Sequence, residues 1–429
     1  MIQIVKASGG EDQKLLALLR ARSSQVDKKV TAQVYEIIEQ VREKKDEALL
    51  VYTKRFDKVE PESLEVPREE ILKARDQADP EFVKALERAR DNIAAFHQRQ
   101  CRQGYRMESE DGVILGQTVR GLERVGLYVP GGTAAYPSSV LMNCVPAKLA
   151  QVGEIIMITP PGKDGRANPD ILTAACVAGV DRVFLVGGAH GIAALALGTQ
   201  SVPRVDKIVG PGNVYVATAK KLLFGQVDID MIAGPSEILI VADETAEPAY
   251  LAADLMSQAE HDPLASAILI TTSEEIAAKT GEELAEQVEK LSRKDTIQES
   301  LEHFGAIFIC DHMDQAVSLA NEIAPEHLEL MVKEPFSYLS RIRNAGSVFL
   351  GRYAPEPLGD YYAGPNHVLP TSGTARFFSP LCVDDFIKKQ SYIYYTRQAL
   401  EKAREDIVRI AEKEGLTAHA QAITVRFER

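Results

Sequence analysis

Two short segments of the chain place imidazole beside carboxyl or amide side chains at spacings that suit metal binding or proton transfer. Gln258 and His261 lie three positions apart near the expected end of a helix, so both side chains can face one point. Glu326 and His327 are adjacent at an expected helix-to-strand junction, where a carboxylate and an imidazole can act as general bases. The first pair indicates a metal site with mixed nitrogen and oxygen ligands, and the second indicates acid–base chemistry. Each pair also fits a purely structural role.

A long segment rich in glycine and proline, residues 351–380, contains Asp360 and His367. Unstructured stretches of this length inside a compact domain are usually functional. We therefore expect this segment to form part of an active site. His419 lies in the C-terminal tail, where composition alone gives it no special status.

Three strand–turn–helix patterns carry glycines at the turn, beginning near Arg124, Val183 and Lys207, and the first turn is Pro130-Gly131-Gly132. Glycine permits positive φ and lets backbone N–H groups approach an anion closely. None of the three turns matches the G-x-G-x-x-G dinucleotide fingerprint, so tight turns needed only for folding remain an alternative. Together they predict a phosphate-bearing ligand at the carboxyl ends of parallel strands.

The elements that must position these residues follow from hydrophobic periodicity. Residues 1–100 are mostly helical in pattern, and strand and helix patterns then alternate over 125–231 and again from residue 236. This alternation predicts an α/β fold with two Rossmann-like parallel-sheet domains. Residues 396–414 form an amphipathic helix, and a short second helical segment ends the chain. Because two helices cannot build a core alone, this tail must dock on the body or on another subunit.

Composition narrows the class of protein. A chain of 429 residues is expected to contain two or more domains. The net charge of −13 argues against nucleic acid as the main partner, and the apolar stretches are too short to span a membrane. The N-terminus lacks the apolar core of a signal peptide. We expect a cytoplasmic protein, because its five cysteines are scattered and contain no C-x-x-C pair: Cys101, Cys144, Cys176, Cys310 and Cys382.

Taken in order, the motifs resemble those of the histidinol dehydrogenase family over nearly the whole chain. The matching segments are YVPGG from Tyr128, SVPRVDKIVGPGN ending at Asn213, AGPSEILIVAD from Ala233, SQAEH from Ser257, APEHLEL from Ala324, and the Asp360 segment with GPNHVLPT. The resemblance implies oxidation of L-histidinol to L-histidine through a bound aldehyde, the last step of histidine biosynthesis. It also implies two NAD⁺ per reaction and a homodimer with one Zn²⁺ in each subunit.

The resemblance also implies roles for individual residues. Glu326 and His327 become the catalytic bases. The implied metal ligands are Gln258, His261, Asp360 and, from the neighbouring subunit, His419. These ligands and His327 are implied to contact substrate as well, together with Ser236, His367 and Glu414. The implied NAD contacts are Tyr128, His190 and Asn213, although the family commonly has glutamine where this chain has His190.

These implications divide the chain into four parts. We expect residues 1–24 to form an N-terminal arm and residues 25–127 with 236–379 to form an α/β domain that holds the metal and substrate. An inserted Rossmann-like domain, 128–235, would bind NAD. Residues 380–429 would form a swapped helical tail that contributes to the site of the partner subunit.

Three other functions remain as alternatives. A thiol-dependent aldehyde dehydrogenase would use Cys144 as its nucleophile, although Cys144 and Cys176 lie in segments where small hydrophobic side chains usually pack. A metallohydrolase would use the same ion to generate hydroxide and would not need NAD⁺. A nucleotide-sensing module would bind NAD without turnover of an amino alcohol.

Overall fold

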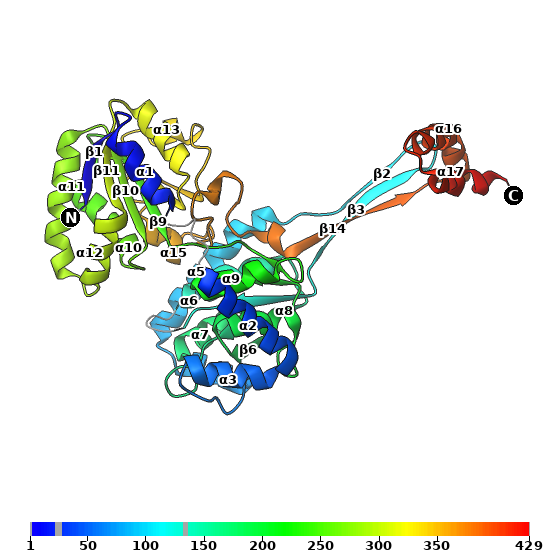
Figure 1. The fold of residues 1–429 in the computed structure, drawn as a ribbon, viewed down its shortest axis with the longest axis horizontal. Coiled ribbons are helices and arrows are strands. Elements are labelled where there is room, and N and C mark those ends of the chain that lie inside the picture. Colours follow the sequence, from blue (N-terminus) through cyan, green and yellow to red (C-terminus); the bar gives the residue numbers. More distant parts are fainter. Residues whose placement is uncertain (1, 22–27, 132–135, 429) are drawn as a thin grey trace. The chain divides into compact units, whose positions relative to one another are not determined.

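The chain folds into two compact units in a computed structural model that describes residues 2–21, 28–131 and 136–428 (Figure 1). The first unit comprises Met1–Gln100 and Leu122–Phe386, and the second comprises Cys101–Gly121 and Ile387–Arg429. Gly132 of the first predicted turn and residues 22–24 of the predicted N-terminal arm lie outside the described residues.

The first unit contains a six-stranded, fully parallel sheet in the order β1-β11-β10-β9-β12-β13. Its strands are β1 (Gln3–Lys6), β9 (Glu237–Ala242), β10 (Ser266–Thr271), β11 (Gly305–Ile309), β12 (His327–Met331) and β13 (Ser347–Leu350). Successive residues of β9 enter opposite cores: Ile238 packs in one, and Leu239 in the other. Figure 1 shows helices on both sides of this sheet. They are α1 (Glu11–Ala21), α10 (Pro248–Ala259), α11 (Glu274–Gln287), α12 (Lys294–Phe304), α13 (Met313–Ile323) and the short α14 (Phe336–Leu339).

The same unit contains a five-stranded parallel sheet in the order β6-β5-β4-β7-β8. Its strands are β4 (Arg124–Tyr128), β5 (Glu154–Thr159), β6 (Arg182–Leu185), β7 (Lys207–Val209) and β8 (Asp228–Ile229). Its helices are α2 (Lys28–Lys44), α3 (Asp46–Phe56), α4 (Arg68–Gln77), α5 (Pro80–His97), α6 (Pro137–Leu149), α7 (Pro169–Ala178), α8 (Gly188–Leu197) and α9 (Val214–Leu223). Helices α2 and α3 share a core with this sheet, although the expected boundaries place them in the other domain. The four-part division of the chain stays a prediction.

The second unit is built on an antiparallel sheet in the order β14-β3-β2. It contains β2 (Tyr105–Glu108), β3 (Ile114–Gly121), β14 (Ile387–Tyr394), α16 (Arg397–Lys413) and α17 (Thr417–Thr424). The predicted helix over 396–414 is confirmed, with Thr396 as N-cap and Glu414 as C-cap. The tail is not purely helical as expected, because β14 precedes α16 and pairs with β3. Several large apolar side chains of this unit are solvent-exposed, including Ile393 at 73% and Ile410 at 61%.

The predicted α/β class with parallel sheets is therefore confirmed, and the small antiparallel sheet is an addition to it. Within the part of the chain that the structure describes, no helix has the length and apolar character needed to cross a membrane.

Candidate active site

The predicted bases lie at the amino end of β12, between β9 and the edge strand β13 of the six-stranded sheet. Helix α13 ends at Ala324, which adopts φ 55°, and Pro325, Glu326 and His327 follow. His327 is in register with the first residues of β13 and with the second residue of β9. Connecting helices run antiparallel to the strands, so α10 ends near the amino ends of the strands and brings Gln258 there. The candidate site is thus built at the amino ends of these strands.

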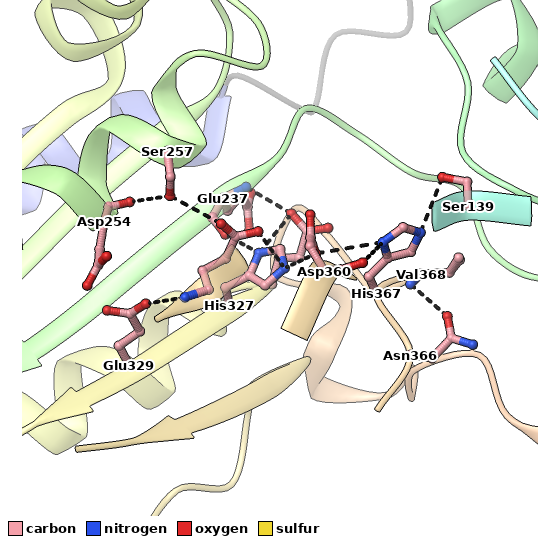
Figure 2. Close-up of polar contacts among 12 residues, drawn as sticks. Ser139, Glu237, Asp254, Ser257, His327, Glu329, Asp360, Asn366, His367 and Val368 are labelled. Atoms are coloured by element: carbon pink, nitrogen blue, oxygen red, sulfur yellow. Dashed lines mark hydrogen bonds and ion pairs between the residues drawn. The ribbon is translucent and has the colours of Figure 1, made fainter. Parts of the chain in front are cut away.

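One tautomer of His327 is fixed by the backbone. Its Nδ1 lies 3.0 Å from the carbonyl oxygen of Glu237 (Figure 2). A carbonyl can only accept, so Nδ1 carries the proton, and in a neutral ring Nε2 is the basic nitrogen. His327 is 3% exposed, and its Nε2 has no hydrogen-bond partner among the described residues. Nε2 lies 3.8 Å from Asp360 Oδ1 and 3.9 Å from Glu356 Oε1.

Glu326 lies on the same side as His327, although adjacent side chains on an extended strand usually diverge. Its Oε2 lies 3.7 Å from His327 Nδ1 and accepts a 2.9 Å hydrogen bond from the Glu237 N–H. Burial raises the pKa of the Glu326 carboxyl to about 7. A carboxylate with this pKa can exchange a proton near neutral pH, as a general base must.

The segment that we expected to be unstructured contains a short helix, α15 (Glu356–Tyr361). It places Glu356 and Asp360 four residues apart, so both carboxylates face His327. One ligand atom from each of these three residues lies within 4.8 Å of the others, which is close enough to hold one metal ion. Sequence reasoning identified Asp360 and missed Glu356, although its spacing from Asp360 was a usable signal.

Glu356 is held from two sides. Its backbone N–H donates a 2.8 Å hydrogen bond to Glu329 Oε1, and its Oε2 accepts from Ser257 Oγ at 3.1 Å. Burial raises the pKa of Glu356 to about 8 and that of Asp254, beside Glu329, to about 6. Several buried carboxyl groups therefore surround one imidazole, and a cation would relieve their mutual repulsion.

Gln258 and His261 have properties that suit a cation ligand, although the described group of clustered ligand atoms comprises His327, Glu356 and Asp360. Gln258 is 1% exposed, and its Oε1 has no hydrogen-bond partner among the described residues. Burial lowers the pKa of His261, which keeps the ring neutral as a metal ligand requires. The charges of Asp360 and of His327 both act on the His261 ring, which therefore lies near them. The imidazole of His261 and the carboxylate of Asp360 are ligand types that Zn²⁺ accepts, and the Gln258 amide adds an oxygen donor.

His367 closes the other side of the site. Its Nδ1 lies 3.1 Å from the backbone carbonyl oxygen of Asp360, so Nε2 accepts from Ser139 Oγ at 3.2 Å. A cavity of about 260 Å³ is lined by His327, Asp360, His367 and neighbouring residues of β13 and α15. The predicted substrate contact Ser236 directly precedes β9 and is half-buried.

The predicted nucleotide contacts lie in the five-stranded half of the first unit. Tyr128 ends β4 and is 4% exposed, and burial raises its pKa to about 12. Asn213 caps α9 by accepting from the Tyr215 and Val216 N–H groups. Its side-chain NH₂ group is a donor and plays no part in the cap. Both residues therefore sit where a helix N-terminus meets the carboxyl end of a strand, an arrangement that suits phosphate.

The surroundings of His190 differ from those of Tyr128 and Asn213. It is 1% exposed, and its Nε2 lies 3.3 Å from Thr53 Oγ1. Burial lowers its pKa to about 3, so the ring is neutral. Its contact with NAD stays a prediction.

The remaining predicted residues belong to the second unit. Glu414 and His419 are both exposed there, Glu414 as the C-cap of α16 and His419 on α17. Their contribution to the site of a partner subunit stays a prediction.

Cys144 is a poor candidate for a nucleophile. It is fully buried in α6, and its Sγ donates to the Ala178 carbonyl oxygen at 3.4 Å. Burial raises its pKa to about 12, which disfavours the thiolate. We expect Cys144→Ser to leave kcat nearly unchanged in a nicotinamide absorbance assay, because serine can keep this hydrogen bond. Loss of activity in a folded variant would instead support the thiol-dependent alternative.

Comparisons with known proteins find relatives over nearly the whole chain. A histidinol dehydrogenase family model matches residues 20–427. The chain is 56% identical to a histidinol dehydrogenase of Clostridium acetobutylicum over 428 residues, covering 100% of this chain and 99% of that protein. It is 57% identical to one of Listeria innocua, covering 99% of each. The crystal structure of histidinol dehydrogenase from Elizabethkingia anophelis superimposes with a TM-score of 0.93 at 37% identity, covering 100% of this chain and 98% of that one.

Proposed function

The chain belongs to the histidinol dehydrogenase family, and on this premise we propose that it oxidises L-histidinol to L-histidine with two NAD⁺ and one bound Zn²⁺ per subunit. This reaction is the last step of histidine biosynthesis. The observation that supports it most directly is the fixed tautomer of His327. The Glu237 carbonyl holds Nδ1–H and leaves Nε2 as a buried base beside Asp360.

In the proposed reaction, His327 Nε2 takes the hydroxyl proton of the bound alcohol. NAD⁺, which Tyr128 and Asn213 would help to hold, would supply the hydride acceptor for the alcohol and then for the hydrated aldehyde. Glu326 takes a proton from the water that attacks the aldehyde carbon. The Glu237 N–H holds Glu326 Oε2 and thereby orients the carboxylate. Two bases serve two oxidations, so no cysteine thioester is needed.

Gln258, His261 and Asp360 would hold the Zn²⁺ ion, together with His419 of the partner subunit. The ion would supply a fixed positive charge, which suits the neutral imidazole of the substrate. Burial lowers the pKa of His327, but Glu326, Asp360 and Glu356 outweigh burial and raise it to about 10. A positive charge beside Asp360 would lower the pKa of His327. A metal bound by Asp360 would therefore favour the neutral imidazole that the base requires.

We also propose a homodimer that exchanges its C-terminal tails. Exposed Ile393 and Ile410 support this arrangement, because apolar surface of this kind is typical of contacts between subunits. Cys144, Cys176, Cys310 and Cys382 form no disulfide among the described residues, which fits the proposed cytoplasmic location.

The proposed four-electron oxidation predicts a fixed yield of NADH. With excess NAD⁺ and limiting L-histidinol, we expect two NADH for each substrate consumed, measured by absorbance at the nicotinamide band. Histidine should appear in equal amount to the histidinol lost. A yield of one NADH with release of free aldehyde would contradict the second oxidation. Turnover of histidinol derivatives without NAD⁺ would favour the hydrolase alternative.

A further inference from the structure

A buried ion pair lies beside the third glycine turn and has no part in the chemistry described above. Lys220, on α9, pairs with Asp230, which directly follows β8. Their side chains are 2% and 1% exposed. Burying two charges is costly unless their remaining hydrogen-bonding groups are satisfied, so the partners of this pair show what it holds.

Both charged groups bind the backbone of one residue, Gly210. Lys220 Nζ donates to the Gly210 carbonyl oxygen at 3.0 Å, and Asp230 Oδ2 accepts from the Gly210 N–H at 2.8 Å. Asp230 Oδ1 also accepts from the Met231 N–H at 2.6 Å. The pair therefore fixes the peptide groups on either side of Gly210, at the point where β7 ends.

Gly210 determines the direction of the turn. Its φ is 116°, and a Cβ atom built on it would lie 2.1 Å from the Tyr128 carbonyl oxygen. Two residues later, a Cβ on Gly212 would lie 3.0 Å from the Tyr128 ring. Asn213 follows and caps α9. The turn thus packs directly on Tyr128 and ends at Asn213, and both are proposed to bind NAD.

We propose that Lys220 and Asp230 are positioning residues for the nicotinamide nucleotide. By clamping Gly210 they hold Tyr128 and Asn213 in the geometry that the cofactor needs, and so they set its affinity without contributing to the histidinol site. This inference rests on the proposed function, since it assumes that NAD binds at this turn.

The chain provides a matched control. Lys207 is also buried, with its side chain 6% exposed, and it pairs with Asp228 at 2.9 Å and Asp385 at 3.8 Å. It begins β7, so it lies at the opposite end of the same strand from Gly210. Removing Lys207 takes away a buried charge whose partner Asp228 is 53% exposed, and it leaves the clamp on the turn in place.

The test compares NADH affinity in the wild-type protein, Lys220→Met and Lys207→Met by titration of NADH fluorescence. We expect the Kd for NADH to rise by about 10- to 100-fold in Lys220→Met, since small displacements of a binding group have effects of this size. Lys207→Met should keep a Kd close to that of the wild type. L-Histidinol binding, measured by calorimetry, should be unchanged in both variants.

A folded Lys220→Met variant with wild-type affinity for NADH would overturn the inference. If this single variant does not fold, Lys220→Met combined with Asp230→Met removes both buried charges, and the same loss of NADH affinity is expected. Wild-type affinity in the double variant would equally overturn it, and Lys220→Arg should restore part of the binding. Failure of the wild-type protein to bind NADH would count against the proposed function instead.

Discussion

Replacing His327 with asparagine is expected to lower kcat by a factor of about 10² to 10⁴, the usual effect of losing a general base. Asparagine can still donate to the Glu237 carbonyl oxygen, which His327 Nδ1 contacts at 3.0 Å. It offers no basic nitrogen in place of Nε2, so the hydroxyl proton has no acceptor. The KM values for L-histidinol and NAD⁺ should change far less than kcat. Steady-state measurement of NADH formation gives all three quantities.

His303→Asn is a suitable control, because His303 is exposed on α12 and should tolerate the change. Unchanged turnover in a folded His327→Asn variant would rule out the proposed base. A large rise in the KM for histidinol with intact kcat would instead assign His327 to substrate binding alone.

The residues of the site that sequence reasoning found are those with a local signal. Glu326 and His327 are adjacent, and Gln258 and His261 have helical spacing. Glu356 was missed because a glutamate in a segment rich in glycine and proline is usually solvated. It becomes part of the site only because α15 forms and the Glu329 carboxylate accepts its N–H, a contact across 27 residues of sequence.

The two parallel sheets could be predicted because their strands are buried on both faces and read as continuous apolar runs. Strand β10, with the sequence SAILIT, is an example, because all six of its residues are buried. The edge strand β1 and the antiparallel β14 gave no such signal, since their residues are almost all exposed. A strand without a buried face has no alternation of polar and apolar residues, so its pairing depends on partners that are distant in sequence.

The direction of the strands and helices distinguishes the proposed nucleotide site from the proposed cation site. The glycine turns lie at the carboxyl ends of β4, β6 and β7, where helix N-termini suit phosphate. The cluster of Glu326, Glu356 and Asp360 around His327 lies at the amino ends of β9, β12 and β13. Helix C-termini lie at this end of the sheet, and they favour positive charge. This polarity agrees with a nucleotide in one half of the unit and a cation in the other.

The second prediction with a large expected effect is the recovery of activity in mixed dimers. It tests the proposed exchange of tails and the proposed metal ligands together. His261→Asn and His419→Asn homodimers should each lose nearly all activity, since every site lacks one metal ligand. In a mixed dimer with one chain of each kind, one site lacks both ligands and the other has all four if His419 comes from the partner. We therefore expect each mixed dimer to regain about half of the wild-type activity, measured as NADH formation per dimer.

The alternative arrangement predicts the opposite result. If His419 bound the metal of its own chain, each chain of the mixed dimer would carry one defective ligand, and no site would be complete. Differently tagged chains purified in two steps ensure that only mixed dimers are assayed, and Zn²⁺ content per dimer gives a second readout. Absence of recovered activity in dimers verified in this way would place the tail ligand within its own chain. The exposed apolar side chains of α16 and β14 would then need another explanation.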